Sequence, residues 1–276
     1  MPELPEVETV ARDLGRRITG FKIGHAELRR QRLAPDISAD LFGQRLAAST
    51  VRFVHRRVKH ILIDLDNGHT LITHLRMTGR FMLLSEDDPD PKFAHAVFHF
   101  SDSQRLVFDD QRHFGLMKIV ETAKILETKE IAKLAPEPFS DEFSPEYLAD
   151  HVRISGRTIK EILLDQTKVC GVGNIYASEA LFLSGISPKK RGRNISRARC
   201  TELHKNMRLV LEEAIELASS IEPHPKVVGE GVYGTGSKSR WRIYDREGYP
   251  CVGCNSGIKR ITQAGRSTYY CAKCQR

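Results

Sequence analysis

Apolar and polar positions alternate along several short runs in the N-terminal half of the chain. Two such runs, residues 60–65 and 70–75, are separated by the turn sequence Asp66-Asn67-Gly68. A second pair follows at residues 96–100 and 105–108. Alternation with a period of two is typical of strands with one buried face, and a short turn between two of them makes an antiparallel hairpin. The pattern therefore predicts an antiparallel sheet or sandwich in this half.

Helical spacing replaces this alternation in two other parts of the chain. Apolar residues recur at intervals of three or four across residues 6–18 and predict a helix there. The same spacing begins after Pro136-Glu137-Pro138 and ends before Pro223-His224-Pro225, because proline is poorly tolerated inside a helix. We therefore expect an α+β chain in three parts, with an N-terminal domain at 1–135, a helical domain at 136–225 and a C-terminal module at 226–276.

The charge of the chain is concentrated near its C-terminal end. The 276 residues carry 43 Lys and Arg against 35 Asp and Glu, a net charge of +8. Residues 226–276 alone hold ten basic and three acidic residues, whereas the rest of the chain is close to neutral. A segment this basic, and too short to bury a large core, indicates a polyanionic partner, of which nucleic acid is the commonest. A solvated basic tail is the alternative.

Neither a membrane span nor a secretory signal is expected. The longest apolar runs, such as Ala180-Leu181-Phe182-Leu183, fall far short of the roughly 18 apolar residues that a span requires. The first six residues contain acids and prolines, where a signal peptide carries a basic end and an apolar stretch. We therefore expect a cytoplasmic protein.

Four of the six cysteines form two closely spaced pairs, Cys251-x2-Cys254 and Cys271-x2-Cys274, with sixteen residues between the pairs. This spacing is typical of a four-thiolate zinc ribbon, in which the ion replaces a missing hydrophobic core. Disulfides, which are disfavoured in the cytosol, and a thioredoxin-like redox motif, which uses one pair, are the alternatives. Cys170 and Cys200 lie alone in helical context and are expected to be buried small side chains.

A glycine turn interrupts the helical pattern at Gly171-Val172-Gly173-Asn174. Glycine permits a tight turn and a close backbone approach, and Asn174 can cap the helix that follows. Free amides at the start of a helix can hold a phosphate. The alternative interpretation is a turn with a purely structural role.

Three of these motifs together resemble the formamidopyrimidine-DNA glycosylase family. They are the start Met1-Pro2-Glu3-Leu4-Pro5-Glu6-Val7-Glu8-Thr9, the turn and helix start at residues 171–179, and the four-cysteine ribbon. The resemblance implies an N-terminal antiparallel β-sandwich with flanking helices, a C-terminal helix-two-turn-helix domain and a zinc ribbon holding one structural Zn²⁺. It also implies a monomer that binds double-stranded DNA containing oxidised bases or abasic sites, in the cleft between the two halves of the chain and in the bacterial nucleoid.

The implied activity is that of a bifunctional DNA glycosylase and abasic-site lyase in base excision repair. Such enzymes excise oxidised purines, 8-oxoguanine and formamidopyrimidines, through a Schiff base on the N-terminal proline followed by β,δ-elimination. Pro2 is a secondary amine once Met1 is removed, and an α-amino pKa of about 8 leaves a nucleophilic fraction near pH 7. Glu3 can protonate the opening sugar ring, with Glu6 as its partner. Read alone, proline and acids here also suit an ordinary helix N-terminus.

Further residues acquire roles only through the resemblance. Lys59 corresponds to a hairpin lysine credited with proton donation in β-elimination. Arg266 corresponds to an arginine that clamps the DNA backbone and assists δ-elimination. The side chains that correspond to those filling the gap left by a flipped-out nucleotide are Met77, Arg112 and Phe114. The residues implied to contact phosphates are His95, Arg157, Lys160 and Asn174.

The chain departs from the usual family pattern in two places. Gln111 and His113 stand where many relatives have proline and arginine, and Arg76 stands where glycine is usual, which leaves the opposite-base preference open. Residues 219–242 replace a longer lesion-recognition loop and leave the lesion preference open. Two alternatives therefore stay: an endonuclease VIII-like glycosylase for oxidised pyrimidines, and a non-catalytic binder of damaged DNA.

Overall fold

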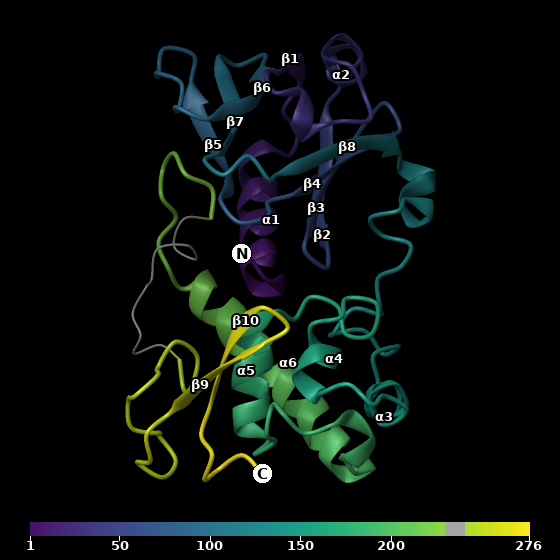
Figure 1. The fold of residues 1–276 in the computed structure, drawn as a ribbon. Helices are drawn as coiled ribbons and strands as arrows, with labels where there is room; N and C mark the ends of the chain where they lie inside the picture. Colours follow the sequence, from purple (N-terminus) through teal and green to yellow (C-terminus); the bar gives the residue numbers. More distant parts are fainter. Residues whose placement is uncertain (230–240) are drawn as a thin grey trace. The chain divides into compact units, whose positions relative to one another are not determined.

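The computed structural model describes residues 1–229 and 241–276 and divides the chain into two units (Figure 1). The first unit contains Met1–Ala132 and residues 217–229, and the second contains Lys133–Glu216 and residues 241–276. The sequence Gly234-Thr235-Gly236-Ser237-Lys238, part of the divergent segment at 219–242, lies outside the described residues. Within the described ranges, no helix combines the length and apolar character that a membrane crossing requires.

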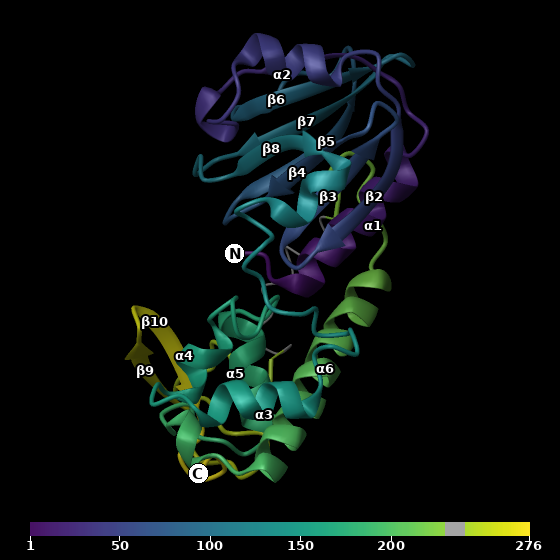
Figure 2. The ribbon, with the colours of Figure 1, turned by 90° about the vertical axis from the view of Figure 1, so that its right-hand side faces the viewer.

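Two antiparallel sheets of four strands form the body of the first unit (Figure 2). One sheet has the order β1 (Ile23–Leu28), β6 (Ala94–Phe100), β7 (Gln104–Asp110) and β5 (Gly79–Ser85). The other has the order β2 (Val51–Arg57), β3 (His60–Leu65), β4 (His69–His74) and β8 (Leu116–Glu121). The two predicted hairpins are β3–β4 and β6–β7, so the predicted sandwich is confirmed. Apolar side chains such as Phe81, Phe98 and Phe108 fill its core.

Helix α1 (Leu4–Ile18) packs against the sandwich along β2. A capping box joins Glu3 and Glu6 at its start, and the Glu3 N–H donates to Glu6 Oε2 at 2.8 Å. The predicted helix is thus confirmed, and it begins two residues earlier than expected because Glu3 is the N-cap residue. The shorter helical elements of the first unit are η1 (Gln31–Leu33), α2 (Ala39–Leu46) and η2 (Thr122–Glu127).

After the long helix α6 (Arg197–Ser219), the chain returns to the first unit. The Val228 N–H donates to Phe81 O at 3.0 Å, and the Leu83 N–H donates to Lys226 O at 2.8 Å, so this segment pairs with the outer edge of β5. Gly229 has φ +67°, and a Cβ there would lie 2.6 Å from Val10 Cγ2. Residues 226–229 therefore belong to the first unit, joined to it by backbone pairing with β5.

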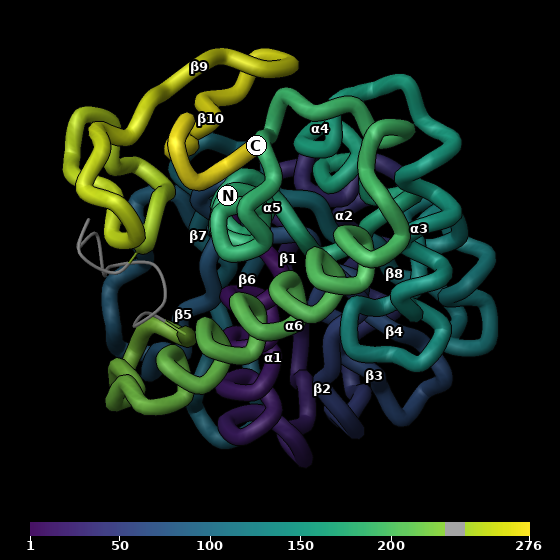
Figure 3. Tube along the Cα trace, turned by 90° about the horizontal axis from the view of Figure 1, so that it is seen from below, coloured from purple at the N-terminus to yellow at the C-terminus, as the bar shows by residue number. Residues whose placement is uncertain are grey.

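Helices and one hairpin make up the described part of the second unit. These elements are α3 (Pro145–Arg153), α4 (Ile159–Leu163), α5 (Asn174–Leu183), η3 (Gly192–Asn194), most of α6, β9 (Lys259–Gln263) and β10 (Arg266–Tyr270). The turns between α4 and α5 give the predicted helix-two-turn-helix arrangement, and β10 lies along α5 (Figure 3). Cys170 and Cys200 are fully buried, as predicted.

Candidate functional site

Pro2 and Glu3 lie immediately before α1, and both are buried. Met1 is exposed and borders a hollow of about 410 Å³ in the first unit. The other residues that line this hollow are Arg32, Arg76, Met77, Phe114, Gly115 and Leu116. With Met1 in place the Pro2 nitrogen is an amide, so nucleophilic chemistry at this atom requires removal of Met1.

The three side chains predicted to fill the gap in DNA belong to two loops of the first unit. Met77 follows β4 and Phe114 precedes β8, and each is 41% exposed. The Arg112 guanidinium lies over the Phe114 ring, 5.2 Å from its centroid. Met77 and Phe114 both line the hollow beside Met1, so the structure brings these two predicted residues together with the N-terminus.

A buried carboxylate, Asp110, organises both loops. It is fully buried at the end of β7, and its carboxylate accepts hydrogen bonds from Thr78 Oγ1 and from the Gly115 N–H, the latter at 2.7 Å. The Arg112 N–H also donates to it, at 3.3 Å. Asp110 therefore holds the loop of Met77 and the loop of Phe114 in one arrangement.

His95, a predicted phosphate contact, is buried beside the backbone of Asp110 rather than exposed. Its Nε2 lies 3.0 Å from Asp110 O and 2.7 Å from His113 Nδ1. Burial lowers the pKa of His95, and the nearby His113 lowers it further, so the neutral ring is favoured. His95 thus packs beneath the loop that carries Arg112 and Phe114.

Lys59 sits in the turn between β2 and β3, where Val58 has φ +56°. Its side chain is buried, and its charge acts on His74. The His60 and His74 rings meet edge to face at 4.8 Å. Burial lowers the pKa of His60 to about 4 and that of His74 to about 2, with Arg76 adding to both shifts. Lys59 therefore lies near two imidazoles whose neutral forms are favoured.

In the second unit, Asn174 connects α5 to the hairpin. Its Nδ2 donates to Ser267 O at 2.8 Å. The prediction that Asn174 caps α5 is wrong: the N-cap is Gly173, because the Asn174 amide is engaged with β10 instead. Lys160 is fully buried below this point, and its Nζ donates to Asn174 O at 3.2 Å and to Ser178 Oγ at 2.5 Å.

The two remaining predicted DNA contacts, Arg157 and Arg266, differ in their surroundings. Arg157 is half exposed and pairs with Asp165 Oδ2 at 2.8 Å, while its other nitrogen donates to Glu161 O at 3.1 Å. Arg266 begins β10 at the tip of the hairpin, directly after a turn in which Gly265 has φ +72°. The Arg266 side chain is exposed, so it is available to a partner.

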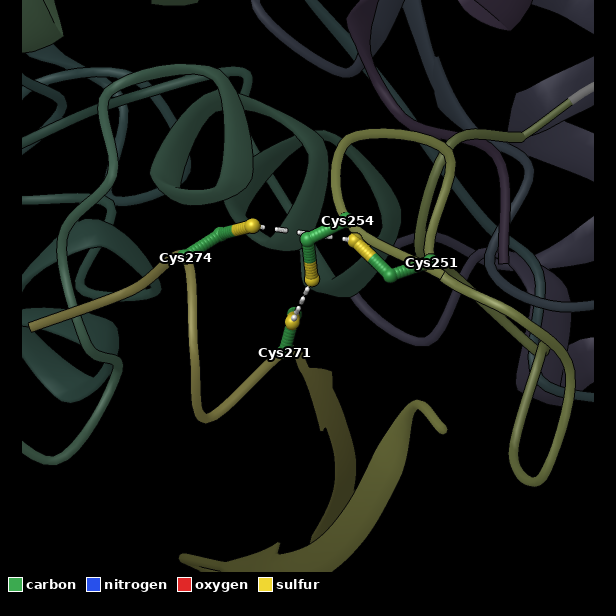
Figure 4. Close-up of side chains that lie close together, drawn as sticks. All are labelled: Cys251, Cys254, Cys271 and Cys274. Atoms are coloured by element: carbon green, nitrogen blue, oxygen red, sulfur yellow. Dashed lines mark hydrogen bonds between the residues drawn. The ribbon is translucent and has the colours of Figure 1, made fainter. Parts of the chain in front are cut away.

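The four cysteines of the two pairs converge (Figure 4). Their sulfur atoms all lie within 4.8 Å of one another, with Cys251 Sγ 3.9 Å from Cys274 Sγ and Cys254 Sγ 3.5 Å from Cys271 Sγ. A tetrahedral zinc ion with Zn–S bonds of about 2.3 Å separates its sulfur ligands by about 3.8 Å, which these distances bracket. The cluster can therefore hold a metal ion.

Comparison with known proteins identifies the family. Residues 1–117 match the model of the formamidopyrimidine-DNA glycosylase N-terminal domain, and residues 134–224 match that of the formamidopyrimidine-DNA glycosylase H2TH domain. Curated proteins named formamidopyrimidine-DNA glycosylase from Ruegeria pomeroyi and Roseobacter denitrificans are 41% and 43% identical to this chain, over 100% of both chains. The chain belongs to the formamidopyrimidine-DNA glycosylase family. The membership predicted from the three sequence motifs is confirmed.

Solved structures of this family have the same fold. The Lactococcus lactis Fpg in complex with DNA containing an abasic site is 33% identical to this chain, with a TM-score of 0.91 over 99% of each chain. A variant of the Lactococcus lactis protein in complex with Fapy-dG-containing DNA is also 33% identical, with a TM-score of 0.91 over 100% of each chain.

Within this glycosylase-family chain, sequence reasoning missed the supporting residues Asp110 and Ser178. The available indication for Asp110 was an aspartate at a strand end, two residues before Arg112, because aspartate commonly accepts local backbone hydrogen bonds there. For Ser178 the available indication was its helical spacing from Asn174 alone, because a serine within a helix usually hydrogen-bonds a backbone carbonyl of that helix. Its Oγ does donate to Asn174 O, at 2.8 Å, while also accepting from Lys160.

Proposed function

We propose that this chain is a bifunctional DNA glycosylase and abasic-site lyase that excises oxidised purines in base excision repair. The observation that carries the proposal is the position of Pro2 and Glu3, directly before α1 and directly after Met1, which borders a hollow lined by Met77 and Phe114. Family membership and the DNA complexes of the Lactococcus lactis relatives support it.

The proposed reaction begins after Met1 has been removed. The Pro2 amine attacks the sugar carbon C1′, the bond from C1′ to the damaged base breaks, and the base leaves with a proton. Glu3 protonates the ring oxygen as the sugar opens, which leaves an iminium between Pro2 and C1′. Loss of a C2′ proton then breaks the bond to the 3′ phosphate, and δ-elimination breaks the bond to the 5′ phosphate. Lys59 serves proton transfer in the first elimination and Arg266 assists the second.

Other residues position the DNA rather than react. Met77, Arg112 and Phe114 occupy the place of the flipped nucleotide, an arrangement supported by the exposure of the two apolar side chains. Asn174 and Arg157 contact phosphates near the lesion. For the buried Lys160 and His95 we propose support from beneath: Lys160 fixes Asn174, and His95 fixes the loop of Arg112.

We infer that the four cysteines bind one structural Zn²⁺. Four thiolates in tetrahedral spacing are the ligand set that Zn²⁺ prefers in ribbons, and the ion would hold together a hairpin with a small core. The proposed role of the ion is to present Arg266 rigidly to the DNA backbone.

The test is borohydride trapping on an oligonucleotide with one abasic site, using protein whose free Pro2 is verified by mass. We expect a strong covalent adduct in the wild-type protein and a much weaker one in Pro2→Gly, because the secondary amine of proline gives a charged iminium directly, whereas the primary amine of glycine gives a neutral imine that must first be protonated. The control is Pro89→Gly, at an exposed loop proline, which should trap normally. Full strand cleavage by Pro2→Gly in a contamination-free preparation would contradict the proposal.

Excision of oxidised pyrimidines is the second candidate. It is favoured by the divergent segment at 219–242 and by a solved Lactococcus lactis relative, 33% identical, whose complex contains DNA with an oxidised pyrimidine. Comparing excision of 8-oxoguanine with excision of thymine glycol from matched duplexes separates the two. Faster release of thymine glycol would replace the purine assignment.

A further inference from the structure

A second group of metal-binding side chains lies on the first sheet, apart from the cysteines. His25 and Glu27 are two residues apart on β1, so they point to the same face of the sheet. On the neighbouring strand β6, His99 is directly opposite His25. Ala26 and Leu28, between and beyond them, point the other way into the core. Three potential ligands therefore share the solvent-facing side of one strand pair.

The ligand atoms of these residues converge on one point. Glu27 Oε1 lies 3.1 Å from His99 Nε2 and 3.7 Å from His25 Nε2, and all three atoms lie within 4.8 Å of one another. A tetrahedral ion with ligands at about 2.1 Å separates neighbouring ligand atoms by about 3.4 Å. The two observed distances fall on either side of this value. His25 is well exposed and can adjust without disturbing the core.

Two further contacts orient the ligands. Glu86 Oε1 lies 2.8 Å from His99 Nδ1, so Nε2 is the ring nitrogen that faces Glu27. Arg29 Nε donates to Glu27 Oε2 at 2.8 Å, which leaves Glu27 Oε1 for the histidines. Glu86 therefore holds the His99 ring with Nε2 directed at the Glu27 oxygen, a position from which both atoms can reach one ion.

The rings of the two histidines stack on each other. The His25 and His99 rings are nearly parallel, with centroids 3.9 Å apart. Both rings present Nε2 to the same Glu27 oxygen, at 3.7 Å and 3.1 Å.

We propose that His25, Glu27 and His99 bind a divalent transition-metal ion of the zinc type, with water completing its coordination. Two imidazoles and one carboxylate suit Zn²⁺, whereas Mg²⁺ and Ca²⁺ prefer oxygen ligands throughout. The bound ion links the edge strand β1 to β6.

The test is a titration of untagged, full-length protein with Co²⁺, after mass spectrometry has verified one Zn²⁺ per chain in the cysteine cluster. We expect one additional Co²⁺ per chain, seen by its visible absorption. Its affinity should fall at least tenfold in His25→Gln, at an exposed position, and in Glu27→Gln, at a half-buried position on the outer face of β1. His151→Gln, a histidine of the second unit, is the control and should bind the additional ion normally.

Two results would overturn the proposal. One is the absence of an additional equivalent of Co²⁺ in the wild-type protein. The other is an additional equivalent whose affinity is unchanged in both variants, which would place that ion elsewhere on the chain.

Discussion

The β-sandwich and the cysteine hairpin hold their chains together in opposite ways. In the sandwich, two sheets and α1 bury a continuous apolar core that includes Phe81 and Phe108. The hairpin with its cysteines has a core of few residues, and four sulfur atoms stand at its centre. The sandwich should therefore depend on close packing and stay folded when metal is lost, whereas the hairpin should depend on bound metal for its folding.

Removing the metal should produce the largest difference between the two regions, because it should unfold the hairpin and leave the sandwich folded. Zinc binding to a small ribbon contributes on the order of 10 kcal/mol to its folding, so chelation or Cys254→Ser should unfold residues 251–274. We expect DNA affinity to fall at least a hundredfold while the backbone amides of the sandwich stay protected from hydrogen exchange. Hydrogen exchange resolved by segment, together with DNA binding, measures both effects. Cys200→Ser, outside the cluster, should keep the metal; full DNA binding by metal-free protein would refute the dependence.

Truncating a core aromatic ring should have the converse effect. Phe108 is fully buried and packs edge to face on Phe81, with ring centroids 5.2 Å apart. Phe108→Ala should lower the free energy of unfolding of the first unit by about 3–5 kcal/mol, because it removes buried surface and leaves a cavity. Denaturant titration and zinc content measured together check this. Phe53→Ala, at an exposed position, should change the free energy of unfolding little, and a loss of zinc in Phe108→Ala would show that the regions are coupled.

Acid should weaken the sandwich through His60. Because burial lowers the pKa of His60 to about 4, the unfolded chain takes up a proton that the folded chain refuses between about pH 6.5 and 4. The contribution of neutral His60 to the free energy of unfolding is fully present above the pKa of the unfolded chain. It declines by about 3 kcal/mol as the pH falls through this window. The free energy of unfolding, measured at pH 7 and at pH 4.5, should decline less in His60→Gln than in the wild-type protein. His151→Gln is the control, and equal declines in all three proteins would contradict the assignment.

The smallest effect is expected at Arg157. Its ion pair with Asp165 is half exposed, so Arg157→Gln should change the free energy of unfolding by less than about 1 kcal/mol. If Arg157 contacts a phosphate, the substitution should also reduce the slope of log affinity against log salt by about one. Binding to a lesion duplex from low to physiological salt measures this slope. An unchanged slope in Arg157→Gln would remove this residue from the DNA contacts.

Periodicity and spacing predicted the parts of the fold that depend on local sequence. The hairpins, α1 and the cysteine cluster follow from alternation, capping residues and the two Cys-x2-Cys pairs. Pairing between distant segments was not predictable in this way. The return of Val228 to Phe81 joins residues far apart in sequence, and no local pattern encodes such a partner.

The candidate site likewise contains residues that motifs could predict and residues whose burial the sequence could not predict. Motifs pointed to Pro2, Glu3 and Asn174, because chemistry restricts which residue types can serve there. The burial of Lys160 and His95 was not predictable, since both read as exposed basic residues in the sequence. Each is buried because it finds hydrogen-bond partners on another element, Ser178 in one case and the backbone of Asp110 in the other.

The returning segment also sets an order of events during synthesis. Leu83 and Phe81 on β5 receive their last backbone partners from Lys226 and Val228, and Gly229 then seats against Val10. A nascent chain that ends at residue 132 lacks all three of these closing residues. The sandwich can therefore be completed on the ribosome only after the whole helical unit has emerged, so the first part of this protein to be made is among the last to be finished.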